Sequence, residues 1–189
     1  LNPFDLLSLI DDPKLHKKAA AGYSKIQNLK NPKKINNIKI NEKIKIGYFS
    51  ADFKSHAVLY LMFDVFKNHD KKKFEIFGFN HSKHKTKLTT EISKHFDRFY
   101  DCSDLSDKEI ALLSRENNIN IAINLTGHTS DSRDGIYQYD PAPIKVNYLG
   151  YPGTMGSDCY NYIIADRIVI PKDKKKDFID GDILLKQLG

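Results

Sequence analysis

Cysteine is scarce in this sequence, and long apolar runs are missing from it. Cys102 and Cys159 are the only cysteines among 189 residues and no CxxC pair occurs, so we expect neither a disulfide framework nor a zinc knuckle. No apolar stretch approaches the roughly 20 residues of a membrane-spanning helix, and no signal peptide leads the chain. The sequence therefore predicts a cytoplasmic protein without a membrane partner.

Motifs for several common ligands are also missing. Without a GxGxxG or a P-loop motif, binding of NAD or of ATP in its usual cradle has little support. The net charge of +6 raises the question of nucleic acid, but much of the excess lies in two short lysine clusters, Lys71–Lys73 and Lys172–Lys176. Both clusters have the pattern of solvated loop ends, and no RNP, KH or helix-turn-helix signature accompanies them. We therefore expect no nucleic-acid partner.

What the sequence does contain is a regular alternation of strand and helix patterns. Two helices are predicted at residues 3–10 and 13–23, with Asp11 and Asp12 in capping position ahead of Pro13, followed by a polar linker at 28–37. Strand patterns then alternate with helical ones, which predicts an α/β, doubly wound and mostly parallel sheet. The strands are expected at 44–50, 74–80, 98–102, 119–125, 144–149 and 162–166, and the helices at 57–66, 86–96 and from 106 onward. Residues 57–66 are apolar on nearly every face, which predicts a buried helix.

Three unusual loops are expected to meet at one edge of this sheet. If the strands follow the common 3-2-1-4-5-6 order, those at 44–50, 119–125 and 144–149 are neighbours, and their carboxyl ends open at the switch point where ligands bind. The first loop brings together a carboxylate, a hydroxyl and an imidazole, which can handle a proton. The loop residues are Asp52, Ser55 and His56, then Gly127, His128 and Arg133, and then Gly150, Gly153, Thr154 and Gly156.

The same features also have simpler interpretations. A histidine after a strand is often a satisfied structural residue, and the glycines could serve only to make turns. His81 and His84 have a spacing possible for metal ligands, but their loop is lysine-rich and lacks nearby carboxylates, so we predict no metal site. Residue patterns alone indicate an α/β domain with a ligand crevice and nothing more specific.

At these loops the chain resembles the catalytic region of the O-linked N-acetylglucosamine transferases, the family that includes the SPINDLY-type proteins. The matching segments are IGYFSADF at residues 46–53 with Ser55 and His56, INLTGHT at 123–129 with Arg133, PAPIKVNYLGYPGTMG at 141–156, and YIIAD at 162–166. They cover about residues 43–171, and the PAPI…LGYPGT run is highly specific to the family.

The resemblance implies a GT-B architecture, in which two Rossmann-like lobes hold a nucleotide sugar between them without a metal or other cofactor. This chain resembles only the amino-terminal lobe. By resemblance, residues 1–36 are a helical segment and linker at the end of a repeat region, 43–171 are the lobe, and 172–189 are a divergent or truncated tail in which residues 182–185 could start a further strand. The implied catalytic residues are His56 and Asp52, and the implied substrate-binding residues are Leu149, Gly150, Thr154, His128 and Arg133.

The implied activity is transfer of N-acetylglucosamine from its UDP carrier to serine or threonine hydroxyls of proteins, with inversion. The implied partners are the UDP-sugar, an acceptor protein, a carboxyl-terminal lobe and tetratricopeptide repeats. Because the missing lobe would neutralise the departing diphosphate, we expect this chain alone to be nearly inactive. The alternatives are a relative that uses another donor such as GDP-fucose, and a truncated, non-catalytic lobe that serves as a protein-interaction module.

Overall fold

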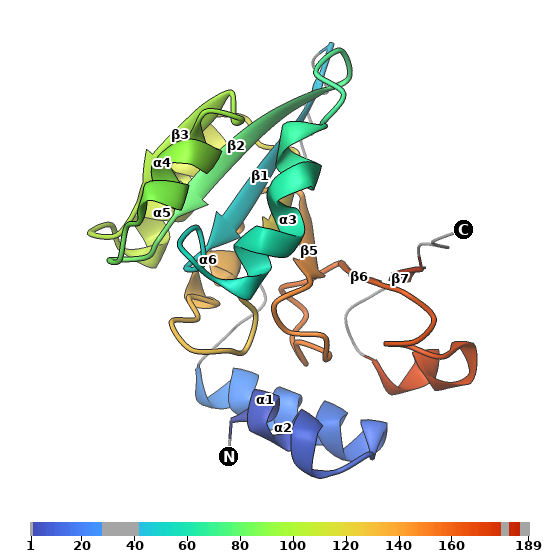
Figure 1. Ribbon diagram of the computed structural model, residues 1–189. Helices are drawn as coiled ribbons and strands as arrows, with labels where there is room; N and C mark the ends of the chain where they lie inside the picture. The colour runs from blue at the N-terminus through green and yellow to red at the C-terminus, as the bar shows by residue number, and fades with distance from the viewer. Residues whose placement is uncertain (1, 28–41, 179–181, 186–189) are drawn as a thin grey trace.

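The structure is a computed structural model that describes residues 2–27, 42–178 and 182–185 (Figure 1). These residues form a seven-stranded sheet in the order β3-β2-β1-β4-β5-β6-β7, with every neighbouring pair parallel. The strands are β1 (Ile44–Ser50), β2 (Phe74–Asn80), β3 (Arg98–Asp101), β4 (Ile121–Asn124), β5 (Ile144–Tyr148), β6 (Tyr162–Ala165) and β7 (Asp182–Leu185). The predicted doubly wound order is confirmed, and β1, β4 and β5 are neighbours as expected.

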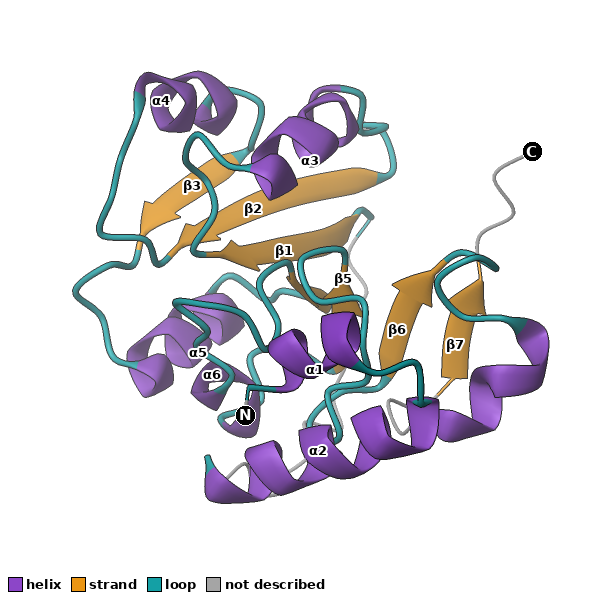
Figure 2. Ribbon diagram, turned by 60° about the horizontal axis from the view of Figure 1, so that its bottom comes forward, coloured by secondary structure: helices purple, strands orange, loops and turns teal. Residues whose placement is uncertain are grey.

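Helices cover both faces of the sheet (Figure 2). On one face, α3 (Ala57–Lys67) and α4 (Lys87–Ser93) share an apolar core with Ile46 and Tyr48 of β1. On the other face, α5 (Asp107–Glu116) and α6 (Gly135–Gln138) share a core with Phe49. Successive β1 side chains thus point to opposite faces, as the period of a strand requires. Helix α4 ends three residues before the predicted end at 96, and the single turn of α6 was not predicted.

The prediction of a buried helix at 57–66 is wrong for five of its nine apolar residues. Val58, Leu59, Met62 and Phe66 of α3 are buried against the sheet. The other side of the helix is open to solvent, where the exposed fractions of Tyr60, Leu61 and Val65 are 60%, 66% and 42%. A sheet can bury only one face of a surface helix, so an apolar sequence did not guarantee burial here.

The two predicted amino-terminal helices are present as α1 (Pro3–Leu9) and α2 (Pro13–Ile26). Asp12 caps α2 as expected, because its carboxylate accepts hydrogen bonds from the backbone N–H groups of Lys14 and Leu15, at 2.9 and 3.2 Å. In both views these helices lie beside the loops after β5, on the side of the molecule away from α3 and α4 (Figures 1 and 2). Helix α2 is therefore placed against one of the loops predicted to form the site.

The described carboxyl-terminal residues extend the sheet. A 3-10 helix, η1 (Lys172–Asp177), follows β6, and the ammonium group of Lys17 on α2 donates a hydrogen bond of 3.0 Å to the carbonyl oxygen of Lys176. The expected strand at 182–185 is confirmed as β7, which pairs with β6. The predicted linker lies outside the described residues, and the division of the chain at 36, 43 and 171 stays a prediction.

Candidate active site

The loop between β1 and α3 places Asp52 and His56 close together at the carboxyl end of a central strand. His56 is the N-cap residue of α3, and its Nδ1 accepts a long hydrogen bond of 3.3 Å from the N–H of Val58. The same Nδ1 lies 3.6 Å from a carboxylate oxygen of Asp52. The imidazole is 44% exposed, whereas the Asp52 side chain is 9% exposed. The loop therefore presents one ring to solvent with a buried carboxylate behind it.

Burial raises the pKa of the Asp52 carboxyl above its ordinary value, and the nearby charges of His56 and Lys54 oppose that rise. The ammonium group of Lys54 lies 3.9 Å from Asp52 and 3.5 Å from Asp131, so it bridges the loops that follow β1 and β4. The sequence interpretation missed Lys54, because nothing in the spacing of residues 52–54 shows which distant carboxylate the lysine meets.

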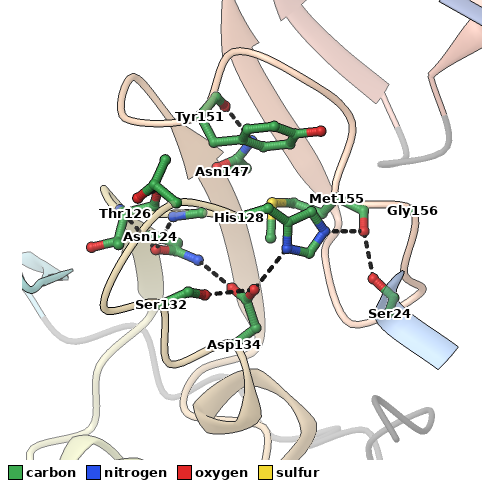
Figure 3. Close-up of polar contacts among 12 residues, drawn as sticks. Ser24, Asn124, Thr126, His128, Ser132, Asp134, Asn147, Tyr151, Met155 and Gly156 are labelled. Carbon is green, nitrogen blue, oxygen red and sulfur yellow. Dashed lines mark hydrogen bonds and ion pairs between the residues drawn. The ribbon is translucent and has the colours of Figure 1, made fainter. Parts of the chain in front are cut away.

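His128 has a different environment, shown in Figure 3. Its side chain is 0% exposed, Nδ1 lies 2.8 Å from a carboxylate oxygen of Asp134, and Nε2 lies 2.9 Å from the carbonyl oxygen of Met155. Both partners are acceptors, so both bonds form only when the ring carries a proton on each nitrogen. A ligand could reach the ring nitrogens only by breaking these bonds, and the substrate-binding role implied for His128 stays a prediction.

Asp134 is the centre of this buried network and was also missed from the sequence. Its carboxylate accepts hydrogen bonds from Ser132 at 2.7 Å, and from Tyr160 and Asn124 at 3.0 Å each. Burial alone would raise its pKa, but the hydrogen bond and charge of His128 and the hydrogen bonds from Ser132 and Tyr160 lower it below the ordinary value. The carboxylate is thus held ionised among the loops after β4 and β5.

The loop after β5 carries Leu149 and Gly150 in a conformation that few sequences allow. Leu149 has a φ of 70°, a left-handed conformation that costs a branched side chain free energy. A Cβ added at Gly150 would collide with the carbonyl group of Leu125 at the end of β4. Asn147 holds the loop from within, since its side-chain amide donates to the carbonyl oxygens of Tyr151 and Gly153, at 3.0 and 3.2 Å. The backbone of this loop is therefore fixed against the neighbouring strand.

Thr154 and Arg133 are less available than the resemblance implied. Thr154 is 1% exposed and its hydroxyl accepts a hydrogen bond of 3.2 Å from the N–H of Gly156. Arg133 donates from Nε to Asp107 at 2.6 Å and from an Nη to the carbonyl oxygen of Leu105 at 2.8 Å. Each lines a cavity, of about 540 Å³ for Thr154 and about 450 Å³ for Arg133.

The other predicted site residues line neither of these two cavities. The cavity beside Thr154 is bounded by α1, α2 and residues 168–178, and the cavity beside Arg133 by the loops after β2, β3 and β4. His56, Asp52, Leu149 and Gly150 share the carboxyl edge of the sheet, and none of them lines either of these two cavities. In residues 2–27 and 42–178 no group of three or more metal-ligating side chains comes together, and no helix is long and apolar enough to cross a membrane.

Comparison with known proteins shows the family to which this chain belongs. The chain belongs to glycosyl transferase family 41, whose model matches residues 15–185, and the resemblance noted in the sequence is confirmed. The fold matches one lobe of a solved mutant of the O-GlcNAc transferase of Thermobaculum terrenum with a TM-score of 0.84. The sequences are 23% identical, and the match covers 93% of this chain and 34% of the solved one.

Curated relatives are similar over the same region. The chain is 36% identical over 131 residues to the probable UDP-N-acetylglucosamine–peptide N-acetylglucosaminyltransferase SEC of Arabidopsis thaliana, covering 69% of this chain and 13% of that protein. It is 31% identical over 162 residues to the Arabidopsis SPINDLY protein of the same description, covering 84% and 17%, and 33% identical over 132 residues to the Caenorhabditis elegans transferase, covering 69% and 12%. The chain thus spans less than a fifth of the length of these relatives.

Proposed function

We propose that this chain is the amino-terminal lobe of the catalytic region of a protein O-glycosyltransferase. The reaction is transfer of N-acetylglucosamine from UDP-N-acetylglucosamine to serine or threonine hydroxyls of an acceptor protein, without a metal ion. Membership of family 41 and the activity named for the curated relatives support this proposal. The observation that carries it is the half-exposed imidazole of His56, set at the carboxyl end of β1 over the buried Asp52.

In this mechanism His56 accepts a proton from the acceptor hydroxyl, or holds that hydroxyl in line with the anomeric carbon. To accept a proton at Nε2, the ring must carry its hydrogen on Nδ1. That tautomer loses the bond from the Val58 N–H and turns a donor toward Asp52, 3.6 Å away. Asp52 is therefore placed to favour the tautomer with hydrogen on Nδ1. This requires the 3.6 Å between Nδ1 and the Asp52 carboxylate to shorten to a hydrogen bond when substrate binds.

The other half of the reaction needs groups that these residues do not supply. Breaking the glycosyl–phosphate bond leaves a diphosphate whose charge must be stabilised, usually the largest contribution to catalysis. By resemblance, that charge is met by the carboxyl-terminal lobe. We therefore propose that this lobe positions the acceptor hydroxyl and the sugar, and that it turns over only together with the second lobe.

The test uses a two-lobe fusion, in which this chain is followed by the carboxyl-terminal lobe of the Arabidopsis SEC relative. With UDP-N-acetylglucosamine and a serine peptide, His56→Ala should lower kcat by about 10²- to 10⁴-fold, the usual contribution of a general base. The matched control is His95→Ala, since His95 follows α4 near the start of β3, at the opposite edge of the sheet. Near-full turnover by the His56 variant would remove this residue from the mechanism.

One observation favours the alternative of a non-catalytic interaction module. Tyr60, Leu61 and Val65 expose apolar surface on α3. Exposed apolar surface of this kind commonly binds another polypeptide. A module of this type would be indifferent to UDP and to UDP-N-acetylglucosamine in calorimetry, and the two-lobe fusion would transfer no sugar.

A further inference from the structure

A polar cavity of about 450 Å³ lies beside the candidate active site. It is formed by the loops after β2, β3 and β4, so it opens at the same edge of the sheet as the loop that carries His56. Its lining residues are His81, Ser82, Lys83, His84, Ser103, Leu105, Asp131, Ser132 and Arg133. Nothing in the proposed reaction uses this cavity.

The side chain of His81 leaves hydrogen-bonding capacity unused at the wall of this cavity. His81 is 8% exposed, and among the described residues its Nδ1 has no hydrogen-bond partner. The side-chain nitrogen of the preceding residue, Asn80, is also buried without a described partner. Since buried polar atoms are nearly always bonded, His81, which lines the cavity, is a side chain on its wall that can take a further polar partner.

His81 presents a neutral ring to that group. Burial, assisted by the charge of Arg133, lowers the pKa of His81 to about 3, while Asp134 and Asp131 oppose the shift and Lys54 adds to it. A neutral imidazole carries one N–H donor, which can bond to an oxygen ligand. An anion bound there would stabilise the protonated ring and raise this pKa.

The charges on the cavity wall favour an anion. Lys83 is exposed and takes part in none of the ion pairs among the described residues. The guanidinium of Arg133 adds a second cation to the wall, with Nε and one Nη already bonded to Asp107 and to the carbonyl oxygen of Leu105. The carboxylate on the wall, Asp131, already has the ammonium group of Lys54 at 3.5 Å. Oxyanions are the ligands that such N–H donors and cations bind best.

The cavity is joined to the candidate active site by a short series of side chains. Asp131 on the cavity wall contacts Lys54, Lys54 lies 3.9 Å from Asp52, and Asp52 lies 3.6 Å from His56. A polypeptide whose hydroxyl group meets His56 therefore lies at the same edge of the sheet as this cavity.

We propose that this cavity is a subsite for an anionic side chain of the acceptor polypeptide, a carboxylate or a phosphorylated residue close to the target hydroxyl. The proposal rests on the proposed function, because it assigns the anion to the acceptor. It makes the loops after β2, β3 and β4 determinants of acceptor sequence preference.

Binding is measured by NMR of the histidine ring protons of this chain, without turnover. Three peptides share one sequence and differ at a position beside the target serine, which is glutamine, glutamate or phosphoserine. The last two should shift the His81 and His84 signals saturably and raise the pKa of His81, and the glutamine peptide should not. Lys83→Ala should weaken binding about fivefold, as an exposed ion pair does, and Lys87→Ala, which removes an exposed lysine at the start of α4, should leave it unchanged. A response to one of the two anionic peptides alone would identify which oxyanion the cavity takes.

Equal binding of all three peptides, an unmoved His81 signal or an equal effect of Lys87→Ala would overturn the proposal. The two-lobe fusion then separates this proposal from the proposed function. If transfer is absent but the anionic peptides still shift His81, the proposed function fails and the anion site remains. If transfer proceeds with the same KM for the glutamine and glutamate peptides, and Lys83→Ala changes neither, the subsite is wrong and the proposed function stands.

Discussion

The hydroxyl group of Ser24 on α2 donates a hydrogen bond of 2.7 Å to the carbonyl oxygen of Met155, in the loop after β5 (Figure 3). That oxygen is also the partner of His128 Nε2, and the ring of Tyr23 lies edge-on to the His128 ring at 5.0 Å. A Cβ at Gly156 would collide with the α2 backbone at Ala21. Helix α2 is therefore part of the wall that fixes the loop bearing Leu149 and Gly150.

Ser24→Ala should lower the free energy of unfolding by about 1 kcal/mol, because it removes one buried hydrogen bond while Met155 keeps its bond to His128. Urea denaturation measures this loss. Ser8→Ala is the matched control, since Ser8 makes an exposed bond of 2.8 Å to Asp5 within α1, and it should change stability by less than about 0.5 kcal/mol. Equal effects of the two changes would mean that α2 does not hold the loop.

A pair of glycine substitutions tests how closely the loop after β5 approaches β4. Gly150→Ala should destabilise the fold by about 2 kcal/mol or more, because the new methyl group meets the backbone of Leu125. Gly22→Ala should stabilise it by up to about 1 kcal/mol, since a Cβ at this position in α2 meets nothing within 4 Å. Thermal unfolding of both variants shows whether each substitution raises or lowers stability. A Gly150→Ala variant as stable as the unchanged protein would contradict the close approach of Gly150 to Leu125.

Much of this fold could be predicted from the sequence, because apolar alternation fixes strands and α/β proteins use few strand orders. The sequence did not show which side chains and carbonyl groups surround a loop residue. His128 sits in a loop of ligand-binding type, but Asp134 and Met155 enclose it, and no local pattern announces those contacts. The position of His56 after the first strand followed from the residue pattern, whereas its catalytic role is implied by the resemblance alone. The exposed face of α3 was missed because the sequence pattern of a helix does not tell whether another part of the protein packs on each of its faces.

The buried Asp134 predicts a loss of stability in acid. Its pKa is lowered in the folded state, so its contribution is present above the ordinary value of 3.8 and is lost as the pH falls through the folded value below it. Asp134→Asn should lower the free energy of unfolding by about 3 kcal/mol near pH 7, because it removes one partner of a buried pair. As the pH falls below 3.8, this difference in the free energy of unfolding between the two proteins should narrow, as measured by denaturant unfolding at several pH values. A difference that is constant with pH would mean that Asp134 is not held ionised.

Asp52→Asn tests whether the buried carboxylate acts through His56. Asparagine keeps the size of the side chain but removes the charge that favours a proton on Nδ1 of His56, so the two-lobe fusion should lose about 10²-fold in kcat with little change in KM for the sugar donor. Stability should not fall with activity, because burial raises the pKa of Asp52 and a neutral side chain suits this position. The double variant with His56→Ala should be no slower than His56→Ala alone. A further loss in the double variant would show that Asp52 acts on the substrate directly and does not work by orienting the ring.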